Sequence, residues 1–120
     1  MSANSESHFV APGSQDGGWH DYSGYPDLQL CTDDSSNQSA VSAPVHGFNI
    51  ATTCCEQDGS AAVRPDCDAH PMTYDEALLF CGSYGYRLCT LQELMYENIA
   101  NDEGCSYDNA YNWVSDECVS

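Results

Sequence analysis

Eight cysteine residues are the side chains of this sequence best suited to covalent chemistry. A thiol can pair as a disulfide, bind a metal ion or act as a nucleophile. Eight in a chain of 120 residues is an even number and far above ordinary usage, which favours a disulfide framework in an oxidising compartment. Sequence alone does not select among the possible pairings, which number on the order of 100. The cysteines are Cys31, Cys54, Cys55, Cys67, Cys81, Cys89, Cys105 and Cys118.

Zinc binding is the alternative use of some of these thiols. The spacing Cys67-x-x-His70, together with the adjacent Cys54 and Cys55, supplies ligands of the kind that tetrahedral zinc takes. The other cysteines show no second pair at such a spacing. We therefore expect disulfides, and because oxidised cysteines have no thiolate, we do not expect thiol catalysis.

Carboxylates are the second group with a chemical use, because clustered Asp and Glu oxygens bind calcium. The candidate calcium ligands are Asp102, Asp108, Asp116 and Glu117. Their spacing fits no EF-hand, and acidic stretches of an acidic protein are more often simply hydrated. Calcium, or a basic partner, would nonetheless relieve the self-repulsion of a chain with a formal charge of −17.

The charge balance also excludes two classes of ligand. Nineteen Asp and Glu residues face only Arg64 and Arg87, with no Lys, so the chain repels nucleic-acid phosphates and anionic lipid headgroups. Its longest apolar run, 77–81, is far shorter than the roughly 20 residues of a membrane-spanning helix. We expect neither nucleic-acid binding nor membrane insertion.

No arrangement typical of an enzyme is present. The chain has no nucleophile elbow, no glycine-rich phosphate loop and no H-E-x-x-H motif, and its histidines lie far apart in the sequence. These histidines are His8, His20, His46 and His70. The sequence predicts a protein that is not an enzyme, and a small metal-assisted enzyme is the weakest alternative.

Residues 1–44 and 45–120 differ in composition and predict two parts. The first is rich in Ser, Asp, Gly and Asn, lacks apolar periodicity and holds the glycosylation sequon, at Asn37. Its aromatic residues predict an extended N-terminal arm that lies on its own domain or on a neighbouring copy. The expected interface residues are Trp19, Tyr22, Tyr25, Tyr107 and Tyr111. Tyr74 and Trp113 are instead expected in the core.

The second part carries clear signals for regular structure. Two capping boxes, each a Thr followed three residues later by a Glu, predict short helices that begin at Thr73 and Thr90. A β-hairpin is predicted over 48–63, and a brief strand over 86–89. The predicted buried face of the first helix consists of Tyr74, Ala77, Leu78 and Cys81.

The segment from Thr73 to Leu94 resembles the two-helix centre of C-type lectin-like domains, with an inward Cys81 and the intervening Arg87-Leu88. The segment 112–118 is similar to the Trp-containing strand and following Cys of that family, in a short, cysteine-rich variant found in secreted algal proteins. The resemblance covers residues 45–118. It implies a C-type lectin-like α+β fold with two short helices and a small antiparallel sheet, rich in disulfides and loops.

The resemblance also implies a disulfide between Cys81 and Cys118, which would join the first helix to the last strand. The remaining pairs would then be Cys89–Cys105, Cys55–Cys67 and Cys31–Cys54. Sugar-binding members hold calcium with a Glu-Pro-Asn or Gln-Pro-Asp triplet and a Trp-Asn-Asp motif, and neither occurs in this sequence. The resemblance therefore supports the scaffold rather than calcium-dependent sugar binding.

Together these observations predict a secreted, extracellular module without enzymatic activity. We expect a structural or adhesive subunit of a cell-surface coat, matrix or fibril, acting through protein–protein contacts and self-association of the N-terminal arm. A calcium-dependent carbohydrate-binding lectin, with glycans as its ligands, is the alternative. Residues 1–6 lack the basic start of a secretory signal, so we expect a removed leader or a longer parent chain.

Overall fold

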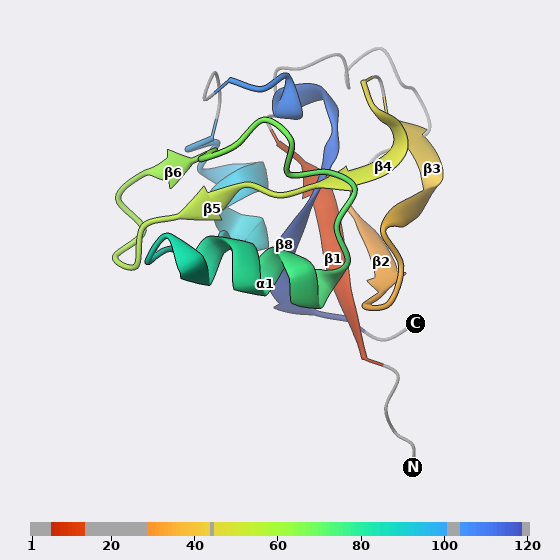
Figure 1. Ribbon diagram of the computed structural model, residues 1–120, viewed down its shortest axis with the longest axis horizontal. Coiled ribbons are helices and arrows are strands. Elements are labelled where there is room, and N and C mark those ends of the chain that lie inside the picture. Colours follow the sequence, from red (N-terminus) through yellow and green to blue (C-terminus); the bar gives the residue numbers. More distant parts are fainter. Residues whose placement is uncertain (1–5, 14–28, 44, 101–103, 119–120) are drawn as a thin grey trace.

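The chain folds around a five-stranded mixed β-sheet, with a three-stranded sheet and one α-helix beside it (Figure 1). The structure is a computed structural model and describes residues 6–13, 29–43, 45–100 and 104–118. In spatial order, the large sheet consists of β2 (Leu30–Asp33), β1 (Ser7–Pro12), β8 (Tyr111–Glu117), β4 (Gly47–Ala51) and β3 (Gln38–Ala43). The small sheet consists of β6 (Ala62–Val63), β5 (Cys54–Cys55) and β7 (Arg87–Leu88).

β1 and β8 lie side by side in the middle of the large sheet. β1 pairs antiparallel with β2 and β8, and β8 also pairs with β4, in parallel. Because β1 comes from residues 1–44 and β8 from 45–120, the division expected at residue 44 does not separate these strands. The strands described within residues 1–44, namely β1, β2 and β3, thus belong to the same sheet as β4 and β8.

Alternate side chains of β8 enter two parts of the core. Trp113 packs in a cluster that includes α1 (Tyr74–Ser83), whereas Val114 packs in a second cluster that includes Leu94. Since successive strand residues point to opposite faces, α1 and the segment around Leu94 cover opposite faces of the sheet. The Trp113 indole Nε1 also donates to the Met72 carbonyl oxygen at 2.8 Å, which anchors the segment that leads into α1.

α1 begins where the sequence predicts. The Glu76 backbone N–H donates to Thr73 Oγ1 at 3.3 Å and the Thr73 N–H donates to the Glu76 carboxylate at 2.8 Å, so the capping box is confirmed. The buried residues of the helix are Tyr74, Ala77 and Cys81, all three expected. Leu78 was also expected in the core, but it is 43% exposed, because the helix contacts the sheet through a narrower stripe.

The second expected helix is only a single π-helical turn, η2 (Gln92–Tyr96). Its predicted capping box is present, since the Thr90 N–H donates to the Glu93 carboxylate at 2.8 Å and the Glu93 N–H donates to Thr90 Oγ1 at 3.1 Å. The chain leaves the helical path at Asn98, which has a left-handed φ of 56°. A capping box fixes where a helix starts but not how long it runs.

The expected two-helix, C-type lectin-like α+β fold is therefore wrong. The described structure is mostly β, with one α-helix, and β2 approaches β3 so that the large sheet nearly closes into a barrel. The predicted hairpin and brief strand do occur as β5, β6 and β7. The parallel pairing of β4 with β8 joins segments distant in sequence, and local sequence signals do not reveal such a pairing.

All eight cysteines form disulfides, as the composition predicts. The pairs are Cys31–Cys118, Cys54–Cys81, Cys55–Cys89 and Cys67–Cys105. The expected pairs Cys81–Cys118, Cys89–Cys105, Cys55–Cys67 and Cys31–Cys54 are all wrong. One reason is that consecutive residues of β5 point to opposite faces, so Cys54 reaches α1 while Cys55 reaches the residue after β7. The other is that Cys31 and Cys118 both lie beside β1.

Removing the Cys31–Cys118 bridge is expected to lower the free energy of unfolding by about 4–5 kcal/mol. The bridge joins residues 87 apart in sequence, and a cross-link over so long a loop strongly restricts the unfolded chain. Urea unfolding of the Cys31→Ser/Cys118→Ser variant, followed by circular dichroism, measures the loss. If the free energy of unfolding fell by less than about 1 kcal/mol, the bridge would not restrict the unfolded chain as expected.

Candidate functional site

The first of the two arginines lies inside the protein. The Arg64 side chain is fully buried, and its Nη1 donates to the Asp108 carboxylate at 2.7 Å and to the Gly104 carbonyl oxygen at 2.9 Å. Its Nε donates to Thr53 Oγ1 at 2.9 Å, and its Nη2 donates to the Gly13 carbonyl oxygen at 3.2 Å. One guanidinium therefore links its own segment to three others.

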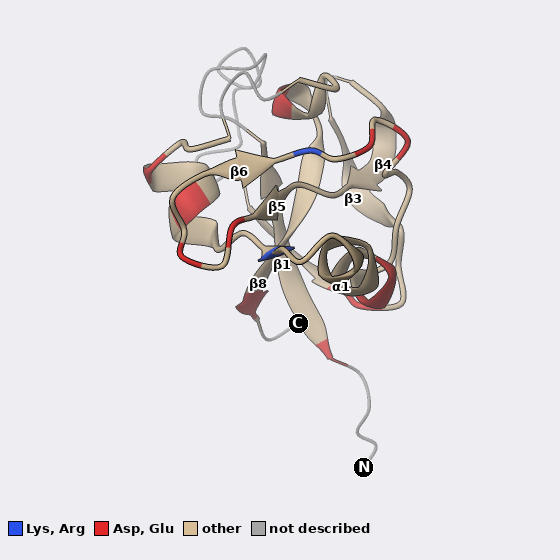
Figure 2. Cartoon of the chain, turned by 60° about the vertical axis from the view of Figure 1, so that its left-hand side comes forward, with Lys and Arg blue, Asp and Glu red and all other residues tan. Residues whose placement is uncertain are grey.

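The second arginine is also paired within the fold. Arg87 donates two parallel hydrogen bonds to the Glu93 carboxylate, at 2.9 and 2.8 Å. These bonds from Arg87 hold the pKa of Glu93 below its usual value. The chain has no other Arg and no Lys. Both arginines are thus neutralised by carboxylates, while Figure 2 shows acidic residues distributed over loops and element ends.

α1 carries an exposed apolar surface on this acidic protein. Leu79 is 75% exposed and its neighbour Leu78 43%, and we call these two residues the α1 face; Tyr84, 51% exposed, follows the end of the helix. Single exposed apolar residues are common on any protein, so the candidate binding surface is the part around Leu79, which also lines a hollow. Asp75 and Glu76 lie in the first turn of the same helix, so negative charge borders the apolar patch.

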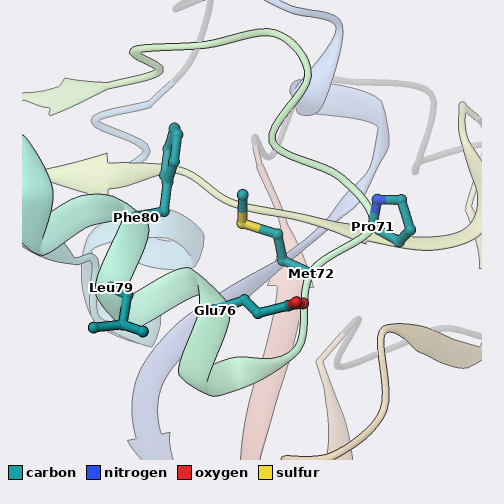
Figure 3. A pocket seen from close by; sticks show the side chains of 5 residues that line it. All are labelled: Pro71, Met72, Glu76, Leu79 and Phe80. Carbon is teal, nitrogen blue, oxygen red and sulfur yellow. The ribbon is translucent and has the colours of Figure 1, made fainter.

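An open hollow lies beside Leu79, which is one of its lining residues (Figure 3). It encloses about 450 Å³ and is lined by Pro71, Met72, Glu76, Leu79 and Phe80. Glu76 is the only ionisable residue of this lining, and its capping bond to Thr73 holds the carboxylate at the start of α1. The hollow is suited to receiving an apolar side chain next to a positive charge.

The candidate calcium ligands that the structure describes are not gathered in one site. Asp108 is paired with Arg64, whereas the Asp116 carboxylate accepts the Leu91 N–H at 2.8 Å. β8 runs between them, and the strand from Tyr111 to Asp116 alone spans roughly 16 Å, at about 3.3 Å per residue. Glu117 ends β8 with its side chain exposed, and Asp102 lies outside the described residues.

The three cysteines expected as zinc ligands are not free to bind zinc. Cys54, Cys55 and Cys67 are all in disulfides, and a bridged sulfur is no thiolate ligand. Within the described part of the chain, one group of at least three metal-ligating side chains comes together, namely Cys55, Cys89 and Glu93. Its cysteines are bridged to each other and its carboxylate is bound by Arg87, so this group offers no metal site.

The aromatic predictions divide into core and surface. Tyr74 and Trp113 are buried, which confirms their expected place in the core. Tyr107 and Tyr111 are fully buried as well, so their expected place at an interface is wrong: Tyr111 fills the core from β8, and Tyr107 from the turn that precedes it. The expected interface residues Trp19, Tyr22 and Tyr25 lie outside the described residues.

Asn37 lies half-buried between β2 and β3, and its carbonyl oxygen accepts the Ile50 N–H at 3.0 Å. Glycosylation at this residue stays a prediction. No helix among the described residues is long and apolar enough to cross a membrane. Comparisons with protein-family models, with curated proteins and with solved structures found no match for this chain.

Sequence reasoning missed the α1 face, although a signal for it exists. Leu79 is apolar but lies outside the stripe of Tyr74, Ala77 and Cys81 that contacts the sheet. An apolar residue outside the buried stripe of an amphipathic helix is exposed by the helix period itself. The helix prediction therefore contained the surface that now stands as the candidate binding site.

Replacing Arg64 by Met is expected to lower the free energy of unfolding by about 3–5 kcal/mol. The change leaves the Asp108 carboxylate without its cation and three further oxygens without their donor. Arg87→Met, in which the lost side chain is 30% exposed, is the matched control with an expected loss of about 1–2 kcal/mol. If both variants lost the same free energy of unfolding in urea, the burial of Arg64 would not explain its contribution to stability.

The contribution of Glu93 to stability is expected to depend on pH. Because its pKa is lower in the folded protein than the usual 4.5, the contribution is complete above that pH and is lost as pH falls through the folded pKa. The stability difference between the wild type and Glu93→Gln should therefore shrink below pH 4.5. Urea unfolding from pH 7 to pH 3 measures it, with exposed Glu97→Gln as the control for loss of one charge. A constant difference would contradict this account.

Proposed function

We propose that this protein is a non-enzymatic, extracellular structural or adhesive module that binds a basic protein partner through the α1 face and its hollow. The observation that carries the proposal is the exposure of Leu79, at 75%, beside an open hollow bordered by the Glu76 carboxylate. Burial of a leucine side chain against a partner contributes about 1.5–3 kcal/mol. Such a contact is enough to anchor a small interface.

The charge of the chain determines the kind of partner. A formal charge of −17 makes two copies repel each other, and neither arginine is available to offset it because both are paired internally. A partner with Lys or Arg next to an apolar side chain fits both the α1 face and its acidic border. Self-association through the expected arm stays a prediction.

The extracellular location rests on the disulfides. Four bridges use every cysteine of the chain, and such frameworks form and persist in oxidising compartments. A rigid, cross-linked scaffold that holds an apolar helix face outward is suited to a coat, matrix or fibril. The lectin alternative has no such support, because the described calcium candidates lie apart.

Replacing Leu79 by Ser is expected to weaken binding to basic, apolar peptides by about tenfold. Surface plasmon resonance with immobilised peptides tests this, each with a central Leu or Phe flanked by Lys and Arg, by Gly and Ser, or by Asp and Glu. The wild type should bind only the basic set, and more weakly as salt is added. Because Leu79→Ser changes no charge, its effect isolates the apolar contact.

Phe48→Ser is the matched control, since Phe48 is 50% exposed on β4 and does not line the hollow. It should alter binding less than twofold. Equal binding of basic and acidic peptides, or equal losses in the two variants, would overturn the proposal.

A further inference from the structure

Two histidines that are distant in sequence lie ring against ring in the fold. The ring centroids of His46 and His70 are 4.1 Å apart, with an angle of 39° between the planes. Tyr107 stands edge-on to both rings, with its centroid 5.6 Å from that of His46 and 5.8 Å from that of His70. Neither the α1 face nor the hollow includes these two residues, which we call the histidine pair.

Each ring of the histidine pair has one unsatisfied nitrogen. His46 and His70 are each only half-buried, but their Nε2 and Nδ1 atoms, respectively, are covered and have no hydrogen-bond partner in the described part of the chain. A buried polar atom without a partner has lost its hydration with nothing in exchange, so two such atoms in adjacent rings call for a ligand. An imidazole nitrogen without a proton offers a lone pair, and a metal ion accepts lone pairs from two imidazoles at once.

A covalent link fixes the loop of His70 against Tyr107, the residue that contacts both rings. The Cys67–Cys105 bridge joins the loop that carries His70 to the segment that carries Tyr107, and Tyr107 packs against both rings. A pair of imidazoles that is already held together needs little further ordering to bind an ion.

The charge around the histidine pair favours a cation. Asp66 and Asp68 lie close enough for their charges to act on the Tyr107 hydroxyl, and their negative potential favours entry of a cation.

We propose that His46 and His70 bind a divalent transition-metal ion of the Zn²⁺ or Cu²⁺ type, with water completing its coordination. Imidazole nitrogen suits these ions, whereas Ca²⁺ and Mg²⁺ prefer oxygen ligands. The site shares only His70 with the zinc site expected from the sequence and uses no thiol. It also differs from the candidate calcium site, which is built from carboxylates.

The wild-type protein provides the first test. ZnCl₂ is titrated into ¹⁵N-labelled protein at pH 7, and long-range ¹H–¹⁵N spectra report the nitrogens of each imidazole. His46 Nε2 and His70 Nδ1 should shift together and saturate, whereas CaCl₂ and MgCl₂ should leave them unchanged. Zinc titration without a shift of these two nitrogens would overturn the proposal, even if zinc binds elsewhere on the acidic surface.

Variants supply the second test, by isothermal titration with ZnCl₂ and CuCl₂. His46→Asn and His70→Asn should each weaken binding at least tenfold. Asn is the chosen replacement because position 46 has a φ of 69°, which Asn tolerates better than most residues. His8→Asn is the matched control, since His8 already bonds the Asp34 carboxylate at 2.7 Å, and it should bind the metal within twofold of the wild type.

Near-UV circular dichroism and the absence of free thiols show that each variant is folded. Unchanged affinity in both folded variants would mean that the ion binds elsewhere and would overturn the site. Should either variant fail to fold, the imidazole shifts of the wild type decide. Because the peptide assay does not involve the histidine pair, the proposed function and this site fail independently.

Discussion

Two adjacent disulfides on one short strand determine where the other elements lie. Cys54 and Cys55 are consecutive in β5 and therefore point to opposite faces. Cys54 binds α1 through Cys81, while Cys55 binds the residue that follows β7 through Cys89. α1 is thus attached covalently on one side, with its buried stripe against the sheet and Leu79 turned outward. The proposed binding surface depends on this attachment, because a free helix of ten residues is too short to be stable in water.

Electrostatics within the fold complement these bridges. The guanidinium of Arg64 donates to oxygens of Gly13, Thr53, Gly104 and Asp108, and so links segments that are distant in the sequence. Gly13 has no alternative here, since a Cβ at that position would lie 2.2 Å from the Tyr107 carbonyl oxygen. With Arg87 paired to Glu93 as well, the fold uses its two arginines for internal order. The resulting surface favours cations of every kind, from a basic protein to a metal ion.

The sequence predicted local features well and long-range ones poorly. The Thr73 capping box, the β5–β6 hairpin and the disulfide state of the cysteines were predictable because each depends on neighbouring residues or on composition. The parallel pairing of β4 with β8 and the central place of β1 were not, since they join segments with no common local signal. The histidine pair was missed for the same reason, because only the fold brings residues 46 and 70 together. Leu79 could have been found, as it lies outside the buried stripe of its own helix.

The Cys31–Cys118 bridge gives the molecule a defined response to mechanical load. Tension applied across the chain, from a point before β1 to a point after Cys118, passes through the sulfur atoms and bypasses the chain between Cys31 and Cys118, which are 87 positions apart. Of the strands that the structure describes, β1 is the one that lies wholly outside this covalent loop, and it is held between β2 and β8 by two antiparallel ladders. Stretching would therefore have to pull out this single strand, while α1, the hollow and the histidine pair carry none of the force.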